Sequence, residues 1–174
     1  MIFIWLLIIL VLLFGLTAFV GAPYVPTRRR DVRSAFEDLY VLSEKDVLLD
    51  IGSGDGVVLR VAASYGAKAV GYEINPLLVL ISRWLSRGTT RVVTELKNFW
   101  RSDFPADTTV VYVFGESRDI ARMAARVQQQ VNKFGRPMHL ISYGFKIPKK
   151  SELASTKSHH LYMFSPARGK TVTL

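Results

Sequence analysis

The chain has 174 residues, no cysteine, three histidines and a formal net charge of +9 at pH 7. The lack of cysteine excludes disulfides, thiolate zinc sites and cysteine nucleophiles. His139 is isolated and His159 and His160 are adjacent, which is not a metal-ligand spacing, so we expect no metal site. The positive charge predicts an anionic neighbour, either a membrane surface or nucleic acid.

An almost unbroken apolar run occupies residues 2–20. As a helix, about 20 such residues span the roughly 30 Å hydrocarbon core of a bilayer. No basic side chain precedes the run, and Thr17-Ala18-Phe19 is a poor cleavage site, so a retained helix is favoured over a cleaved signal peptide. A buried soluble helix is the third interpretation. We therefore assign residues 1–22 to a transmembrane anchor.

A cluster of arginines follows the apolar run. Its members are Arg28, Arg29, Arg30 and Arg33. The positive-inside rule places the following domain on the cytosolic side of a single-pass protein, or on the matrix side in a mitochondrion. These side chains could also contact anionic lipid headgroups, or they could form a solvated turn. Residues 23–45 are interpreted as a juxtamembrane arm with a first helix over 31–40, capped by Asp31.

Short apolar runs alternate with helical spacings through residues 46–174, which we assign to one domain. The pattern predicts strands at 47–51, 68–73, 91–96, 110–114 and 138–143, and helices at 57–65, 77–86 and 117–134. Residues 161–164 predict a further strand that pairs with either 153–156 or 171–174. This alternation predicts a Rossmann-like α/β fold, with a mostly parallel sheet and one antiparallel strand near the C-terminus.

A glycine-rich loop joins the first predicted strand to the helix after it. Gly52, Gly54 and Gly56 give the spacing G-x-G-x-G, whereas a dinucleotide site requires G-x-G-x-x-G. Glycines let the backbone approach a ligand closely, and the start of a helix presents free N–H groups. An ordinary tight turn would have the same glycines, so the neighbouring acids carry the argument.

Two carboxylates flank this loop. Asp50 precedes it and Glu73 ends the second predicted strand. A carboxylate at position 50 would repel a pyrophosphate but would attract a ligand with an ammonium and a sulfonium group. Glu73 is placed where Rossmann-type domains bind ribose hydroxyls. Together they predict S-adenosylmethionine as the cofactor. A nicotinamide cofactor, or Asp50 as a simple turn residue, is the lesser alternative.

Several motifs resemble class I methyltransferases, and most closely the mitochondrial protein-lysine methyltransferases of the ATP synthase c-ring protein and the adenine nucleotide translocase, with their prokaryotic relatives. The motifs are PYVPT (23–27), DIGSGDG (50–56), AVGYEINP (69–76), NFW (98–100) and VVYVFG (110–115). The resemblance covers most of residues 23–143. It implies S-adenosylmethionine-dependent methylation of a lysine on a membrane-associated protein.

Carried over by position, the resemblance implies a set of cofactor-binding residues. They are Asp50, Gly52, Ser53, Gly54, Asp55, Gly56, Glu73, Ile74, Asn75, Asn98 and Phe99. Ile74 would lie against the adenine face, and Tyr24 would lie in the arm that closes over the cofactor. Asn98 stands where the family usually has an aspartate that accepts from the adenine amino group, and its carbonyl oxygen can also accept.

Phe114 and Glu116 are our candidates for the wall and the polar contact of the acceptor site. Core packing is the alternative for Phe114, and a first-turn helix acid is the alternative for Glu116. Tyr112 and Tyr143 could belong to the core or to the pocket. The family continues after the fourth strand with an apolar residue and proline, whereas this chain has Glu116 and Ser117, which leaves the acceptor open.

Three classes of function remain. The first is a lysine methyltransferase for a membrane protein, the second a methyltransferase for a lipid or small-molecule acceptor, and the third a non-catalytic S-adenosylmethionine-binding membrane module. Nucleic acid is not an expected partner, because the N/D-P-P-Y/F motif of amino-methylating enzymes is missing after the fourth predicted strand.

Overall fold

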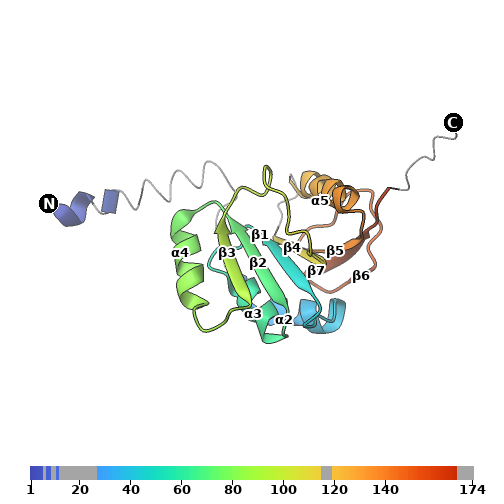
Figure 1. The fold of residues 1–174 in the computed structure, drawn as a ribbon, viewed down its shortest axis with the longest axis horizontal. Coiled ribbons are helices and arrows are strands. Elements are labelled where there is room, and N and C mark those ends of the chain that lie inside the picture. Colours follow the sequence, from blue (N-terminus) through green and yellow to red (C-terminus); the bar gives the residue numbers. More distant parts are fainter. Residues whose placement is uncertain (6, 9–10, 12–26, 115–118, 168–174) are drawn as a thin grey trace.

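The fold is a mixed sheet between two layers of helices (Figure 1). It comes from a computed structural model that describes residues 1–5, 7–8, 11, 27–114 and 119–167. Within these residues the sheet has seven strands in the order β3-β2-β1-β4-β5-β7-β6. Their bounds are β1 Val47–Ile51, β2 Lys68–Glu73, β3 Val92–Leu96, β4 Val110–Phe114, β5 Met138–Tyr143, β6 Ala154–Ser155 and β7 His159–Phe164. β7 is antiparallel to both of its neighbours, and the other pairs are parallel.

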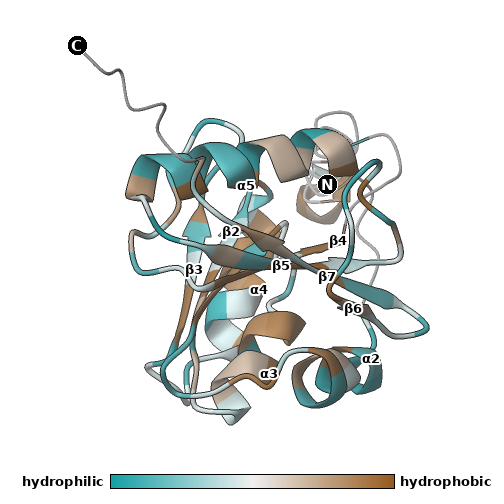
Figure 2. Ribbon diagram, turned by 90° about the vertical axis from the view of Figure 1, so that its right-hand side faces the viewer, coloured by the Kyte–Doolittle hydropathy of each residue, from teal (hydrophilic) through white to brown (hydrophobic). Residues whose placement is uncertain are grey.

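Helices cover both faces of this sheet (Figure 2). One face carries α2 (Arg29–Ser34), the π-helical turn η1 (Ala35–Leu39), α3 (Val57–Ser64) and α4 (Pro76–Leu85), and the other face carries α5 (Ile120–Phe134). Alternate residues of the strands pack on opposite faces, so Leu48 joins the core under α2 and α3, and Leu49 joins the core under α5. Strand order reverses between β1 and β4. The carboxyl ends of these two strands are therefore the expected binding position of an open α/β sheet.

The predicted Rossmann-like sheet with one antiparallel strand is confirmed. The strands at 47–51, 68–73, 110–114 and 138–143 have the predicted bounds. The C-terminal strand is longer than predicted, and it pairs with residues 154–155; the alternative partner, 171–174, lies outside the described residues. The predicted helix at 117–134 begins later, at Ile120, with Asp119 at its N-cap; residues 115–118 lie outside the described residues.

The first helix differs from its prediction. It begins at Arg29, which places Asp31 in the first turn instead of at the cap, and its second half is the π-helical turn η1. An acid in the first turn is still favoured by the helix dipole. The wider turn follows from a main-chain bond from the N–H of Tyr40 to the carbonyl oxygen of Ala35, 2.9 Å away.

The predicted anchor over residues 1–22 is described only in part. The described residues of this run are helical from position 2 onward, and their apolar side chains, including Ile2, Phe3 and Trp5, are exposed. Among the residues that the structure describes, no helix has the length and apolarity needed to cross a bilayer. The domain boundaries at 22/23 and 45/46 stay predictions.

Candidate active site

The glycine loop turns back over the end of β2. The N–H groups of Gly52 and Ser53 both donate to the carbonyl oxygen of Tyr72, at 2.9 and 3.2 Å. Gly52, Gly54 and Gly56 have φ values of +74°, +53° and +79°, the left-handed region that favours glycine. The loop therefore needs its glycines for its backbone path, and α3 begins directly after it.

Most backbone N–H groups of this loop already have partners within the protein. Gly54 donates to the Glu73 carboxylate at 2.9 Å, Gly56 to the carbonyl oxygen of Ser53 at 2.9 Å, and Val57 to the Asp55 carboxylate at 3.3 Å. A phosphate-binding loop must offer its N–H groups to the anion. Because these groups are engaged within the protein, the loop is poorly suited to a pyrophosphate. This agrees with the predicted cationic ligand.

Glu73 joins the loop to the end of β2. Its Oε2 accepts from Gly54, and its Oε1 accepts from the N–H groups of Ile74 and Asn75, both at 2.8 Å. A carboxylate has about four lone-pair sites, so one site remains, on Oε2. The buried Glu73 side chain can therefore accept a hydroxyl while it holds the loop in place.

Asp50 is the second buried carboxylate, with 3 % of its surface exposed. Burial raises its pKa well above the ordinary value, and the charges of Glu73 and Asp55 raise it further. No donor among the described residues forms a hydrogen bond with this carboxylate. The structure thus brings Asp50, Glu73 and the glycine loop together, as predicted, and concentrates negative charge that a cationic ligand would neutralise.

Among the other predicted cofactor residues, Asn75 and Asp55 have partners within the protein, whereas the Ser53 hydroxyl has none among the described residues. Asn75 caps α4, because its Oδ1 accepts from the N–H groups of Leu77 and Leu78 at 3.0 and 3.4 Å. Asp55 forms an ion pair with Arg60 at 3.3 Å. The hydroxyl of Ser53 is buried without a hydrogen-bond partner and lies against Gly71 of β2. Their cofactor roles, and that of half-buried Ile74, stay predictions.

Asn98 begins the turn that follows β3. Its Oδ1 accepts from the N–H of Trp100 at 3.0 Å, and its main-chain oxygen accepts from Arg101 and Ser102. The rings of Phe99 and Trp100 lie against each other, with centroids 4.2 Å apart and planes tilted by 35°. The carbonyl oxygen that the sequence assigns to the adenine amino group is thus already engaged by Trp100. Only its second lone pair is left for a ligand.

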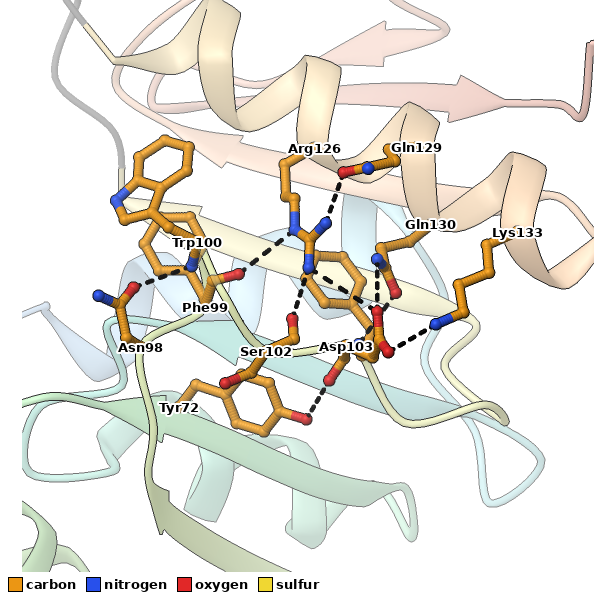
Figure 3. A network of polar contacts seen from close by, with 11 residues as sticks. Tyr72, Asn98, Phe99, Trp100, Ser102, Asp103, Arg126, Gln129, Gln130 and Lys133 are labelled. Atoms are coloured by element: carbon orange, nitrogen blue, oxygen red, sulfur yellow. Dashed lines mark hydrogen bonds and ion pairs between the residues drawn. The ribbon is translucent and has the colours of Figure 1, made fainter.

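This turn is fastened to α5 by residues that sequence reasoning missed (Figure 3). Arg126 donates to the carbonyl oxygens of Phe99 and Ser102, at 3.4 and 2.8 Å. Gln130 accepts from the N–H of Phe104 at 3.0 Å and donates to Asp103 at 3.2 Å. Gln130 is a buried amide on an otherwise apolar helix face, and this irregularity was the available signal for its role.

A row of aromatic side chains follows the ends of β4 and β5. Phe114 and Tyr143 are half-buried neighbours with ring centroids 5.0 Å apart. The Tyr143 hydroxyl donates to Asp31 of α2 at 3.3 Å, and its ring packs against buried His159. Tyr112 is fully buried and shares a 2.8 Å hydrogen bond with His159. Tyr112 therefore belongs to the core, whereas Phe114 and Tyr143 lie at the partly exposed carboxyl ends of β4 and β5.

The remaining catalytic candidates, Tyr24 and Glu116, lie outside the described residues. No group of three or more histidine, aspartate or glutamate side chains within the described part of the chain could hold a metal ion.

The family profile described as "ANTKMT methyltransferase domain" matches residues 50–153. The lysine N-methyltransferase of the ATP synthase C subunit from Xenopus laevis is 32 % identical over 117 residues, which cover 66 % of this chain and 50 % of the relative. A protein-lysine N-methyltransferase of Saccharolobus islandicus is 34 % identical over 97 residues, covering 53 % of this chain and 59 % of the relative. This chain spans about half the length of the curated relatives that it matches.

Among solved structures, an RNA methyltransferase of Salinibacter ruber in complex with S-adenosyl-L-homocysteine superposes with a TM-score of 0.71. It is 26 % identical, and the match covers 83 % of this chain and 95 % of that protein.

Proposed function

Since this chain belongs to the ANTKMT methyltransferase family, we propose that it is an S-adenosylmethionine-dependent methyltransferase that acts on a lysine of a membrane-associated protein. The relatives that carry the name lysine N-methyltransferase support this acceptor. The observation that carries the proposal is the pair of buried carboxylates at the glycine loop.

The described residues fit this cofactor. Asp50 is a buried acid without a described donor, which suits the ammonium of the methionine part. Glu73 keeps one lone-pair site for a ribose hydroxyl. The engaged N–H groups of the loop disfavour the pyrophosphate of a dinucleotide. Phe99, held by Arg126, stands beside Asn98 at the proposed adenine end.

When bound, S-adenosylmethionine supplies a methyl group activated by a sulfonium. The protein's contribution is to place the acceptor in line and to favour its neutral form. A lysine with a pKa near 10.4 requires roughly 4–5 kcal/mol for deprotonation at pH 7. Half-buried Phe114 and Tyr143 are register partners at the carboxyl ends of β4 and β5, and Phe114 lies two residues beyond Tyr112, the register partner of Asp50. They offer an aromatic wall at the same end of the sheet as Asp50, and such a wall disfavours the ammonium form of a lysine.

The membrane location is part of the proposal. The first described residues are helical and expose apolar side chains, which water would solvate poorly. Together with the arginines at 28–30 and 33, this supports a single-pass anchor with the domain on the cytosolic side, or on the matrix side in a mitochondrion. A protease that reaches the domain from outside intact cells would contradict this orientation.

The test incubates the full chain with radiolabelled S-adenosylmethionine, native membranes and cellular RNA. We expect label in protein, recovered as methyl-lysine after hydrolysis, and loss of labelling with Glu73→Ala. Asp107→Ala is the matched control, because Asp107 is an exposed acid paired with Lys68 at 3.0 Å. Label only in lipid or only in RNA would contradict the lysine acceptor. Cofactor binding without any label would indicate the non-catalytic module.

A further inference from the structure

Helix α4 has apolar side chains on its outer face as well as its inner face. Leu78 and Val79 are buried against the sheet. On the other side, Leu80 is 61 % exposed, Ile81 36 %, Trp84 62 % and Leu85 41 %. With Leu77, these residues follow the spacing i, i+3, i+4, i+7, i+8, which forms one continuous stripe along a helix. We call residues 77, 80, 81, 84 and 85 the outer stripe.

An outer stripe of this kind is unusual for a helix on the surface of a soluble domain. Surface helices normally place polar residues opposite the buried face, and α5 does so, since its outward side is largely hydrophilic (Figure 2). α4 lies beside β3, the edge strand of the sheet. Thr94 of β3 faces α4, since its hydroxyl shares a 2.7 Å hydrogen bond with Ser82, and exposed Leu96 alternates onto the same face. Exposed apolar side chains thus occupy both the outer face of α4 and the adjoining end of β3, and apolar patches of this kind mark interaction sites.

The charge around the outer stripe is positive. α4 contains no acidic residue, and Arg83 and Arg87 lie in its last turn and just beyond it. The Arg87 guanidinium stacks over the Trp84 ring, 4.8 Å from its centroid. Arg83 is held by the carbonyl oxygen of Thr94 at 2.9 Å. Both arginines line a shallow hollow between α4 and β3, where the single acid, Glu95, is paired with Lys97 at 2.8 Å.

We propose that the outer stripe of α4 docks on a bilayer that contains anionic phospholipid. Tryptophan and aliphatic side chains flanked by arginine match the interface of such a membrane, where the rings and chains enter the acyl boundary and the guanidinium groups meet phosphates. The long arginine side chains can reach headgroups while their stems cover apolar surface. This docking surface does not depend on methyl transfer.

A second copy of the chain suits this face less well. A two-fold contact between identical patches would bury Arg83 and Arg87 of both protomers, and α4 has no acidic residue to pair with them; like charges in an interface oppose association. An anionic bilayer instead neutralises these arginines. The docked helix and the proposed N-terminal anchor would then be two attachments of one domain, which fixes its orientation on the membrane.

The test uses the fluorescence of Trp84 in the full chain reconstituted into vesicles. Trp5→Phe with Trp100→Phe leaves Trp84 as the single tryptophan. Trp5→Phe with Trp84→Phe leaves Trp100, which is the matched control because Arg122 of α5 stacks over it at 4.1 Å. The vesicles contain brominated phosphatidylcholine, with or without phosphatidylglycerol, since bromine quenches only tryptophans at acyl depth.

We expect blue-shifted, quenched emission from Trp84 in the vesicles with phosphatidylglycerol, weaker quenching without it, and none for Trp100. Arg87→Glu should shift the docked equilibrium toward the undocked form on the order of tenfold. Unquenched Trp84 in the anionic vesicles, equal quenching of both tryptophans, or a Trp84 shift that follows protein concentration without lipid would each overturn the proposal. The last of these results would indicate self-association.

Discussion

Replacing Asp50 by asparagine separates what this side chain does for stability from what it does for binding. The carboxylate is almost fully buried near Glu73 and Asp55, and burial raises its pKa well above the ordinary value. Asparagine has nearly the same shape and no charge. Both side chains bury a polar group, but only aspartate also buries a charge, so we expect Asp50→Asn to stabilise the ligand-free protein at neutral pH by about 1 kcal/mol or more.

For a domain of this size, 1 kcal/mol corresponds to about 2–4 °C in Tm, so thermal unfolding resolves the predicted gain. The same substitution removes a charged partner of the ligand ammonium, and charged hydrogen bonds contribute about 1.5–3 kcal/mol. We therefore expect calorimetric titration to show that S-adenosylmethionine affinity falls roughly tenfold to a hundredfold.

The pH dependence gives an independent check. Because the folded protein raises the pKa of Asp50, it binds more protons than the unfolded chain above the ordinary aspartate range, and this group destabilises the fold as pH rises. Asp50→Asn should remove this decrease in the free energy of unfolding with rising pH. Asp107→Asn is the control, since Lys68 lowers the pKa of this exposed acid, and a loss within about 1 kcal/mol is expected. A lower Tm together with unchanged affinity in Asp50→Asn would refute the reasoning.

Three further predictions concern the surroundings of the site. Gly56→Ala should destabilise the fold by about 2 kcal/mol or more, because alanine at φ +79° costs about 1–2 kcal/mol and its Cβ would collide with the Ser82 hydroxyl. Gly52→Ala is the control, because its Cβ would meet open space. The difference in Tm between the two variants therefore measures the cost of the collision with Ser82. Burial lowers the pKa of His159 from 6.5 to about 4, so the unfolded chain binds more protons between these values. Acidification from pH 6.5 to about 4 should therefore lower the free energy of unfolding, measured by denaturant titration, by about 3 kcal/mol through this group. A free energy of unfolding that does not change over this pH range would contradict a buried neutral imidazole. Arg126→Ala should lower S-adenosylmethionine affinity several-fold and change the Trp100 emission, because the turn after β3 loses its hydrogen bonds to α5. Unchanged Trp100 emission would show that the turn keeps its conformation without Arg126.

The sequence alone determined the elements that depend on local patterns. β1, β2, β4 and β5 have their predicted bounds, because continuous apolar runs bounded by glycine and polar residues identify buried strands. The same holds for Asp50 and Glu73, since parallel strands joined by a right-handed crossover place their carboxyl ends side by side. Short spacing along the chain was enough to predict that these two acids meet at the glycine loop.

Only the tertiary structure decided the contacts between distant segments. The turn at Asn98 is held by Arg126 and Gln130 of α5, more than 25 residues away, and no periodicity encodes that pairing. The choice of residues 154–155 as the partner of β7, and the apolar outer stripe on α4, likewise became visible only when the layers were assembled. A sequence pattern shows which residues are apolar or polar, but the packing of the other elements decides which face of a helix is buried.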